Sequence, residues 1–436
     1  MANTDDLFPI LDQPRVNGLG RMAMESEHLD AGHDVEFRSL AAKSILNKSV
    51  SKRLGWMAWS INPYRGCEFG CRYCYARYTH EFLAPAASEP MRGVLADADS
   101  STPVARQALP PLSSRSNAEG SAGVPAVAPA AGLSRQADPS AALRDDNGKA
   151  LRDDNERGSG VVDLRDPDAF ERRIFIKSNA AWLLEQDLRR LAKQGRLQEE
   201  IAIGTATDPW QPIERRAKVT RSLLEVLARY EGLRIGIVTK SSLIQRDIDL
   251  LQQIAERSTL VVHITITTPD VELARKLEPR APRPDLRFET VWKLRQAGIR
   301  TGVLNSPLLP GITDSAESID RMAALAKRYD ASFFAAMPLF LKSCSRPTYF
   351  DFVRDNFPHL QVLYAERFRD MDFASRPYRL RLEALVKASC VRHGLRERLT
   401  DNLLTRDAGD ERSFTRLGEK RPAQSVLAQA QGLLFG

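Results

Sequence analysis

Short runs of β-branched and other apolar residues alternate with helical patterns in the chain after Arg173, and this alternation limits the possible folds most strongly. The segments between the runs place apolar residues at the i, i+3, i+4 spacing of amphipathic helices. Alternating strands and helices form a parallel sheet with crossover helices. The sequence therefore predicts an α/β fold, with buried strands over residues 174–177, 201–207, 234–240, 260–267 and 299–305.

Two further runs extend this predicted sheet. Residues 56–62 could supply a first strand and residues 332–338 a late one. Six or seven βα units can close into a full or partial barrel or lie as an open sheet, and the periodicity leaves both arrangements open. In either arrangement the loops at the carboxyl ends of the strands carry the chemistry, so we expect the site residues at that edge.

The composition changes between about residues 84 and 160, where Ala, Pro, Ser, Gly and Asp dominate and LRDDN occurs twice. Such a segment cannot bury enough apolar surface to offset its ordering entropy, so we predict a disordered insertion there. We expect an N-terminal segment over residues 1–55 and a βα domain over 56–345, which the insertion interrupts. A basic helical extension over 346–436, with no clear strand pattern, follows.

Composition excludes several classes of protein. With 436 residues, 43% of them hydrophobic, the chain is globular and is not a fibre or a disordered tail. Five cysteines are few and odd in number, which argues against a disulfide framework and for reduced thiols. No stretch is apolar over about 18 residues, and no signal peptide is evident, so we expect a cytoplasmic protein without a membrane partner.

Three of the five cysteines, Cys67, Cys71 and Cys74, lie close together after a predicted strand with the spacing C-x3-C-x2-C. Cysteine thiolates hold iron–sulfur clusters, and three ligands to a four-iron cluster leave one iron open to a small molecule. Gly66 permits a tight backbone path around such a cluster. The alternative is a zinc-stabilised, non-catalytic binding module with His80 as the fourth ligand.

The cysteine spacing, with Tyr73 before the last cysteine, resembles the signature of the radical S-adenosylmethionine (SAM) superfamily. The resemblance implies a partial (β/α)6 barrel of the TIM type and a [4Fe–4S] cluster on the three cysteines. It also implies that SAM binds the open iron and is cleaved reductively to methionine and a 5′-deoxyadenosyl radical. An external electron donor such as flavodoxin or ferredoxin would reduce the cluster.

Further segments resemble the spore photoproduct lyase branch of DNA-repair enzymes, in order along the chain and at predicted strand ends. They are CRYCYAR, IGTATDP, IVTK, HITITT, KLEP and GVLNSPLLPG. The resemblance implies that Lys240 contacts the SAM carboxylate and that Thr265 hydrogen-bonds SAM, with Thr267 on the same side of the strand. The complete set of implied cofactor-binding residues is Tyr73, Gly204, Thr205, Thr207, Asp208, Lys240, Thr265 and Thr267.

One position departs from the lyase pattern. In the lyases the loop aligned with GTATD carries a cysteine that returns a hydrogen atom to the product radical, and here the residue is Thr205. A threonine O–H bond is too strong for that transfer. Two other residues are candidate catalytic donors: Tyr75, which matches a relay tyrosine of the family, and Cys344, which follows the last predicted strand. We therefore expect SAM cleavage without efficient repair of spore photoproduct.

Several other side chains follow predicted strand ends. Two prolines flank Trp210, whose ring either stacks on a flat substrate or plugs the barrel mouth. Glu214 either orients a substrate or lies at the surface. Arg280 and Arg283, beside Glu278 in KLEPRAPRP, could bind phosphate or could be ordinary loop charges.

The net charge of +7 permits an anionic partner, and the distribution of the charged residues along the chain is more informative. Residues 367–400 hold nine Lys or Arg against four Asp or Glu, with aromatic residues between them. A phosphate-binding surface has this composition, and so does a solvated helix face. Together with the lyase resemblance, this favours nucleic acid as the substrate, and a peptide or small molecule is the alternative.

Overall fold

Two β-sheets organise the computed structural model. A ten-stranded sheet has the order β14-β13-β12-β11-β10-β9-β8-β7-β4-β3, and a four-stranded sheet has the order β1-β2-β6-β5. The predicted insertion over residues 84–160 lies outside the described part of the chain. The structure describes residues 27–32, 35–48, 58–81, 168–398, 404–407 and 414–416.

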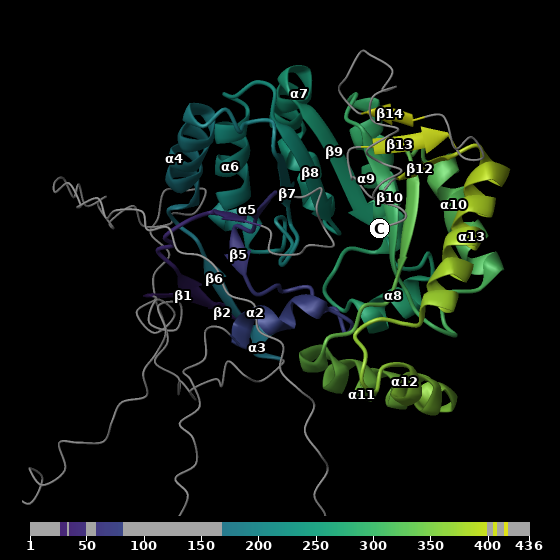
Figure 1. The fold of residues 1–436 in the computed structure, drawn as a ribbon. Coiled ribbons are helices and arrows are strands. Elements are labelled where there is room, and N and C mark those ends of the chain that lie inside the picture. The colour runs from purple at the N-terminus through teal and green to yellow at the C-terminus, as the bar shows by residue number, and fades with distance from the viewer. Residues whose placement is uncertain are drawn as a thin grey trace, which may run out of the picture. The chain divides into compact units, whose positions relative to one another are not determined.

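Six parallel strands follow one another in chain order within the larger sheet, as a partial (β/α)6 barrel requires (Figure 1). The predicted fold class is confirmed. These strands are β4 (Trp59–Ile61), β7 (Glu200–Ile203), β8 (Arg234–Thr239), β9 (Thr259–Thr265), β10 (Thr301–Leu308) and β11 (Phe334–Pro338). An antiparallel strand, β3 (Leu46–Lys48), flanks β4.

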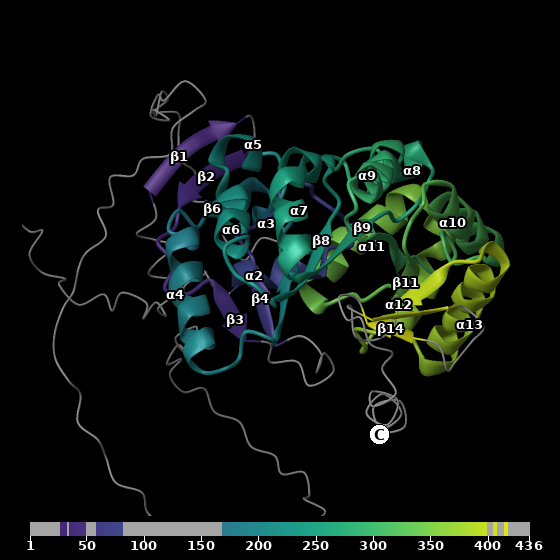
Figure 2. The ribbon, with the colours of Figure 1, turned by 90° about the horizontal axis from the view of Figure 1, so that it is seen from above.

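Amphipathic helices connect these strands. In the first of them Leu184, Leu188 and Leu191 are buried at positions i, i+4 and i+7, which is the apolar stripe that packs on a sheet. Figure 2 shows α4, α6 and α7 next to one another along the sheet. The connecting helices are α4 (Ala180–Lys193), α5 (Glu214–Ala217), α6 (Val219–Leu227), η4 (Ser242–Asp247), α7 (Ile248–Arg257), α8 (Val271–Leu277), α9 (Pro284–Gln296) and α10 (Ala316–Arg328).

The predicted strand over residues 174–177 forms, but it belongs to the smaller sheet. This strand, β6 (Arg173–Ile176), pairs in parallel with β2 (Val35–Ser39) and antiparallel with β5 (Tyr64–Arg65), and β1 (Glu27–Gly32) lies beyond β2. Its apolar residues are buried in that sheet, so an apolar run alone could not show which sheet it joins. The smaller sheet matters because β5 leads directly into the three-cysteine segment.

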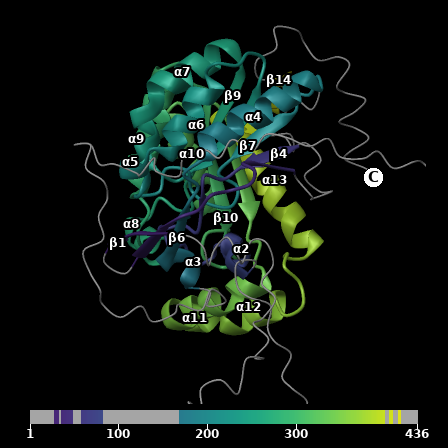
Figure 3. The same cartoon turned by 90° about the vertical axis from the view of Figure 1, so that its left-hand side faces the viewer.

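The chain after residue 345 is helical as expected, but only as far as His393. Its long helices are α11 (Arg346–Asn356), α12 (Gln361–Arg367) and α13 (Arg376–His393), and α13 packs against α10. Figures 1 and 3 show α11 and α12 at the lower end of the sheet. No helix in the described residues is long and apolar enough to cross a membrane.

Three strands that the sequence does not predict follow α13. They are β12 (Arg396–Arg398), which lies parallel to β11, and the antiparallel strands β13 (Leu404–Asp407) and β14 (Phe414–Arg416). Each has only three or four residues, and so short a run carries no detectable alternation. They lengthen the sheet at the β11 side.

The register of the parallel strands brings their ends to one edge. Ile61 of β4 pairs with Ile203 of β7, which pairs in turn with Ile237 of β8. The residues after the first two strands, Asn62 and Gly204, therefore lie together, and the Gly204 amide donates to the Ile61 carbonyl at 3.1 Å. This edge is the carboxyl edge at which the sequence predicts the site.

Candidate active site

The three cysteines lie on one loop, residues 66–74, directly after β5, and we call this segment the cysteine loop. Two backbone hydrogen bonds anchor it to other elements. The Cys67 amide donates to the Phe170 carbonyl, and the Arg72 amide donates to the Leu277 carbonyl at the end of α8, both at 2.9 Å. Two of the three thiols are buried and the third is partly buried. The loop is therefore held from both sides.

Two glycines let this loop pass close to its neighbours. Gly66 has φ +82°, and a Cβ there would lie 2.8 Å from the carbonyl oxygens of Phe170 and Arg173. Gly70 has φ +63°, and a Cβ there would overlap the carboxylate of Glu171. Only glycine adopts these conformations without strain and leaves this space. The expected tight backbone path is thus present.

A buried carboxylate ties the cysteine loop to surrounding arginines. Glu171 lies 3.4 Å from the guanidinium of Arg77 and 3.5 Å from that of Arg280. Arg77 donates to the Cys71 carbonyl at 3.3 Å, and Arg280 donates to the Glu68 carbonyl. Arg280 therefore acts on the loop and is not a free phosphate ligand. In sequence Glu171 has no motif around it, and Arg77 ends the CRYCYAR segment without an assigned role, so only the structure shows what these two residues do.

The loop after β7 supports the cysteine loop through its polar side chains. The Thr207 hydroxyl donates to the Gly66 carbonyl at 2.6 Å, and the Gln211 amide donates to the same carbonyl at 3.3 Å. The Gln211 carbonyl oxygen accepts from the Glu68 amide at 2.8 Å. Thr207 thus orients the cysteine loop, and its predicted contact with SAM stays a prediction. Gln211 was missed, although its place in TDPWQP after a strand end was a usable signal.

The donor set fits an iron–sulfur cluster chemically. Burial, helped by the Asp208 carboxylate, raises the pKa of Cys67, and burial raises the pKa of Cys71 to about 12. Such thiols stay protonated near neutral pH unless a positively charged metal centre displaces the proton. In the described residues, no three His, Cys, Asp or Glu side chains are close enough to hold one metal ion. Each thiolate of a four-iron cluster binds a different iron, so the three thiols of such a site do not converge on one point.

His80, the fourth ligand of the zinc alternative, is engaged elsewhere. It is buried, and its Nε2 lies 2.9 Å from the Arg173 carbonyl oxygen. Its ring packs against Phe170 and Phe175, with ring centres 5.3 and 5.8 Å away. Burial lowers the pKa of His80 to about 4, so the imidazole is neutral. These contacts assign His80 to the wall beside the cysteine loop.

Asp208 joins the ends of two neighbouring strands. Its carboxylate is buried and accepts from the Trp210 amide at 2.9 Å, the Thr239 hydroxyl at 2.7 Å and the Lys240 amide at 2.7 Å. Burial raises the pKa of Asp208, and the three hydrogen bonds oppose that rise. The carboxylate therefore fixes the backbone at Lys240, the predicted SAM-carboxylate ligand.

A second buried carboxylate accepts hydrogen bonds from two of the predicted cofactor-binding residues. Glu278 accepts the hydroxyl of Tyr73, and it accepts the hydroxyl of Thr267 at 2.8 Å. Its other oxygen lies 2.5 Å from the guanidinium of Arg287, and the Lys240 ammonium lies 5.7 Å from the centre of the Tyr73 ring. Burial opposes ionisation of Glu278, but the two cations outweigh it, so the pKa of Glu278 is lowered. From the sequence alone, Glu278 is expected only on a loop, without this role.

Seven of the eight residues predicted to bind SAM lie at or just beyond strand ends on the carboxyl edge, and the eighth, Tyr73, lies on the cysteine loop. Residues 204–208 follow β7, Lys240 follows β8, and Thr265 ends β9. Their contacts with SAM stay predictions. Asn62 was missed: its side chain donates to the Thr205 hydroxyl at 3.3 Å and accepts from the Ala206 amide at 2.8 Å. It also follows a strand end, so the same signal could have found it.

The buried pair between Glu278 and Arg287 yields a stability prediction. We expect Glu278→Gln to lower the free energy of unfolding by about 3 kcal/mol, because Arg287 is left buried without its counter-charge. Urea unfolding of the anaerobically reconstituted protein, followed by circular dichroism, measures this loss. The matched control is Glu289→Gln, whose partner Lys293 is 2.7 Å away at the exposed surface. It should cost less than about 0.5 kcal/mol, and equal losses would contradict the prediction.

Both candidate hydrogen-atom donors lie beside the cysteine loop. Tyr75 is 39% exposed, and its hydroxyl donates to the Thr205 carbonyl. Cys344 lies on η5 (Ser343–Ser345), with its sulfur 3.6 Å from the Ser345 hydroxyl, which donates to the Cys74 carbonyl at 2.7 Å. The structure thus brings Tyr75, Thr205 and Cys344 to one place. Their catalytic roles stay predictions.

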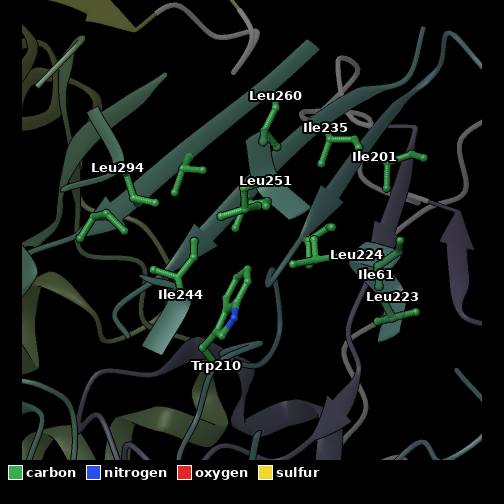
Figure 4. Close-up of a cluster of buried hydrophobic side chains, with 14 of the residues drawn as sticks. Ile61, Ile201, Trp210, Leu223, Leu224, Ile235, Ile244, Leu251, Leu260 and Leu294 are labelled. Atoms are coloured by element: carbon green, nitrogen blue, oxygen red, sulfur yellow. The ribbon is translucent and has the colours of Figure 1, made fainter. Parts of the chain in front are cut away.

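Trp210 and Glu214 are both fully buried, which decides between their alternative interpretations. Figure 4 shows the Trp210 indole among apolar side chains such as Ile244, and its N–H donates to the Asp247 carboxylate at 2.8 Å. The proposed stacking of Trp210 on a substrate is therefore wrong. Glu214 is 2.8 Å from the guanidinium of Arg246, so it is neither a surface group nor a substrate ligand.

The basic C-terminal stretch contributes to a pocket of about 320 Å³ beside the loop after β10. The Arg367 guanidinium lies 4.4 Å from the Tyr378 ring centre, and Arg381 donates to the Asp314 carbonyl at 3.3 Å. Arg283 instead pairs with Asp285 at 2.8 Å on the surface. The pocket lining is Gly311, Ile312, Asp314, Ser315, Leu363, Arg367, Tyr378 and Arg381.

Comparison with known proteins finds similarity to relatives and to solved structures. The uncharacterized protein Rv2578c of Mycobacterium tuberculosis is 24% identical over 377 residues, which cover 86% of each chain. The uncharacterized protein MJ0683 of Methanocaldococcus jannaschii is 29% identical over 135 residues, 31% of this chain and 50% of that protein. Spore photoproduct lyase complexed with dinucleoside spore photoproduct has a TM-score of 0.48 at 11% identity, covering 82% of this chain and 79% of that one.

A family model described as the radical SAM superfamily matches residues 178–323. These residues contain β7 to β10 with their connecting helices, and so they include Lys240, Asp208 and Glu278. The cysteine loop precedes the match in sequence and lies against the same carboxyl edge. The match shows a radical SAM domain over residues 178–323 of this chain, as the resemblance in sequence implies, and it supports assigning the protein as a radical SAM enzyme.

Proposed function

We propose that this enzyme binds a [4Fe–4S] cluster through Cys67, Cys71 and Cys74 and binds SAM at the remaining iron. When bound and reduced, the cluster supplies the electron that cleaves SAM to methionine and a 5′-deoxyadenosyl radical. An external donor such as flavodoxin or ferredoxin would deliver that electron. The observation that carries the proposal is the attachment of the cysteine loop to the loop after β7, to the end of α8 and, through Tyr73, to Thr267 beyond β9. That attachment holds three thiols beside the predicted SAM residues.

The chain's own residues would position SAM around this loop. Lys240 would offer a cation to the SAM carboxylate, and Asp208 fixes the Lys240 backbone while Glu278 holds Tyr73 next to the ammonium. Gly204 begins the loop after β7 with φ +90°, a conformation that leaves its neighbour Thr205 facing Asn62 and Tyr75. These residues would bind and orient SAM, and the buried surroundings restrict the access of water to the thiols.

We further propose that the substrate is nucleic acid. The support is the basic stretch over residues 367–400, part of which lines a pocket next to the loop after β10 with Arg367 and Arg381. Guanidinium groups that line a pocket suit phosphate oxygens. The pocket also holds the Asp314 carboxylate, but that group accepts from the Gly311 amide and the Tyr378 hydroxyl, both at 2.8 Å.

Two measurements test these proposals. Anaerobic reconstitution with iron and sulfide, then reduction in the presence of SAM, should release 5′-deoxyadenosine. A protein that binds zinc and releases none would overturn the chemistry. Binding of labelled DNA and RNA oligonucleotides should weaken steeply as salt rises, because phosphate contacts release counterions. An enzyme that cleaves SAM but shows no salt-dependent affinity for nucleic acid would leave a peptide or small molecule as the substrate.

The threonine at position 205 gives a sharper prediction. The wild type should cleave SAM but repair little spore photoproduct in a DNA oligonucleotide, because the Thr205 O–H bond is too strong to return a hydrogen atom. Thr205→Cys should raise the repaired product per 5′-deoxyadenosine at least about tenfold, since its thiol would sit beside Tyr75. The ratio is measured by liquid chromatography, with Thr205→Ser as the matched control. Efficient repair by the wild type would contradict the idea.

A further inference from the structure

A row of three aromatic rings, Tyr75, Phe340 and Phe373, extends away from the cysteine loop, and we call it the aromatic strip. The rings come from three separate segments: η3 (Tyr75–Arg77), the residues after β11, and the loop before α13. Tyr75 directly follows the last cysteine, Cys74. The strip therefore has one end at the candidate active site.

The rings are in direct contact along the row. The centres of Tyr75 and Phe340 are 5.7 Å apart with a tilt of 50°, and those of Phe340 and Phe373 are 4.5 Å apart with a tilt of 26°. Tyr75 is exposed and the two phenylalanines are partly exposed. Aromatic rings left partly open to solvent in a row are unusual on a protein that needs them only for its core.

Backbone contacts make the aromatic strip rigid. Phe340 and Phe373 face one another across an isolated antiparallel β-bridge, and the Leu341 amide donates to the Asp372 carbonyl at 2.9 Å. The bond from the Ser345 hydroxyl to the Cys74 carbonyl at 2.7 Å ties the same segment to the cysteine loop. The ring positions are thus set before any ligand arrives, which reduces the entropy lost on binding.

Two cations accompany the strip. The Lys342 ammonium lies 4.6 Å from the Tyr78 ring centre and 6.0 Å from that of Phe340. The Arg379 guanidinium lies 5.9 Å from the Phe373 ring centre. Within the described residues neither cation has a carboxylate at ion-pair distance, and the neighbouring Asp372 pairs with Arg346 at 3.1 Å. Both cations therefore remain available to an anionic ligand.

We propose that the aromatic strip stacks unpaired bases of a single-stranded or locally opened nucleic acid, while Lys342 and Arg379 contact its phosphates. Partly exposed aromatic rings with cations beside them are features by which proteins hold single strands, because every base has a π-face and every linkage a charge. A paired duplex hides its base faces and would meet only the cations. The inference rests on the proposed function and narrows its substrate to a base presented outside a helix, next to Tyr75.

The test uses the reconstituted holoenzyme and a fluorescein-labelled oligothymidine of about 12 nucleotides, a length within the usual site size. Phe340→Ala and Phe373→Ala should each weaken binding about tenfold, the typical effect of losing one stacked base. Lys342→Gln and Arg379→Gln should each flatten the salt dependence of the affinity. The controls are Trp182→Ala and Arg328→Gln, an exposed ring on α4 and an exposed cation on α10 that lie off the strip.

A second readout locates the bases directly. An oligonucleotide with 5-iodouracil, irradiated on the holoenzyme, should cross-link to Tyr75, Phe340 or Phe373, as peptide mass spectrometry would show. A merely structural role for these rings would give no such adduct. Equal affinity of the wild type and Phe340→Ala for the single strand, or tighter binding of the duplex form, would overturn the proposed role of the aromatic strip. Preferential binding of a glutamate–tyrosine copolymer at the same residues would also overturn it, in favour of a peptide.

These outcomes are separable from failure of the proposed function. Phe340→Ala and Phe373→Ala should release 5′-deoxyadenosine from SAM at the wild-type rate in the absence of nucleic acid, because neither ring touches the residues assigned to the cluster or to SAM. If the wild type releases no 5′-deoxyadenosine, the proposed SAM cleavage is wrong, whether or not the aromatic strip binds nucleic acid. If the wild type releases 5′-deoxyadenosine and the strip variants bind DNA unchanged, only the strip is wrong.

Discussion

Replacing any one of Cys67, Cys71 and Cys74 by alanine should abolish cluster assembly, because two thiolates cannot hold a four-iron cluster that already lacks a fourth protein ligand. Iron and sulfide content per chain and the EPR signal of the reduced protein measure the loss. We expect each variant to be colourless after anaerobic reconstitution and to release no 5′-deoxyadenosine. This is the largest effect that we predict for a single side chain.

The matched control is Cys390→Ala. This cysteine is buried in α13, with its sulfur 4.0 Å from the Phe334 carbonyl oxygen, and it lies outside the cysteine loop. Its removal should leave the iron content intact and cost about 1 kcal/mol of stability, as expected for a small buried side chain. If one of the three loop cysteines could be lost with full iron content, the ligand assignment would be incorrect.

Gly204→Ala should prevent folding or lower the stability by more than about 4 kcal/mol. Gly204 begins the loop after β7 with φ +90°, and a Cβ there would overlap the Val238 carbonyl oxygen and lie 2.8 Å from the Pro209 Cδ. The clash is with the backbone of the adjacent strand, so no rotamer change can relieve it. Soluble yield and the midpoint of thermal unfolding measure this effect.

The control variant Gly195→Ala separates the stability lost through a steric clash from the stability lost through the left-handed backbone conformation. Gly195 also has a positive φ, +66°, but a Cβ there would meet no heavy atom within 4 Å. This control should cost only about 1 kcal/mol, the strain of a left-handed conformation for a residue with a side chain. Similar losses in the two variants would show that the close approach at Gly204 is not needed for the fold.

The parallel strands could be predicted because each is a buried apolar run with a helix after it. Such runs report burial, and burial alone does not name a partner strand. This is why residues 174–177 were predicted as a strand but were assigned to the wrong sheet. The strands after α13 were not predicted, because each has only three or four residues and so shows no detectable alternation. The first of them, β12, pairs with β11 at only one position, Phe334 with Glu397.

The candidate site, too, could be predicted from the sequence only in part. Strand ends of a parallel sheet share one edge, so Lys240, Thr265 and residues 204–208 could be placed together from sequence. The sequence could not show which side chains point inward. Trp210, which looked exposed between two prolines, is fully buried because Asp247, 37 residues later, accepts its N–H.

The sequence by itself determined the α/β class, the carboxyl edge as the site and the three-cysteine loop, because these depend on residue order along the chain and on local periodicity. Only the tertiary structure decided that Glu278 unites Tyr73, Thr267 and Arg287, and that Tyr75, Phe340 and Phe373 form one row. These groups are assembled by contacts between residues that are far apart in the sequence, as Tyr75 and Phe340 are. Such contacts exist only after the sheet and the C-terminal helices have packed, and no local pattern encodes them.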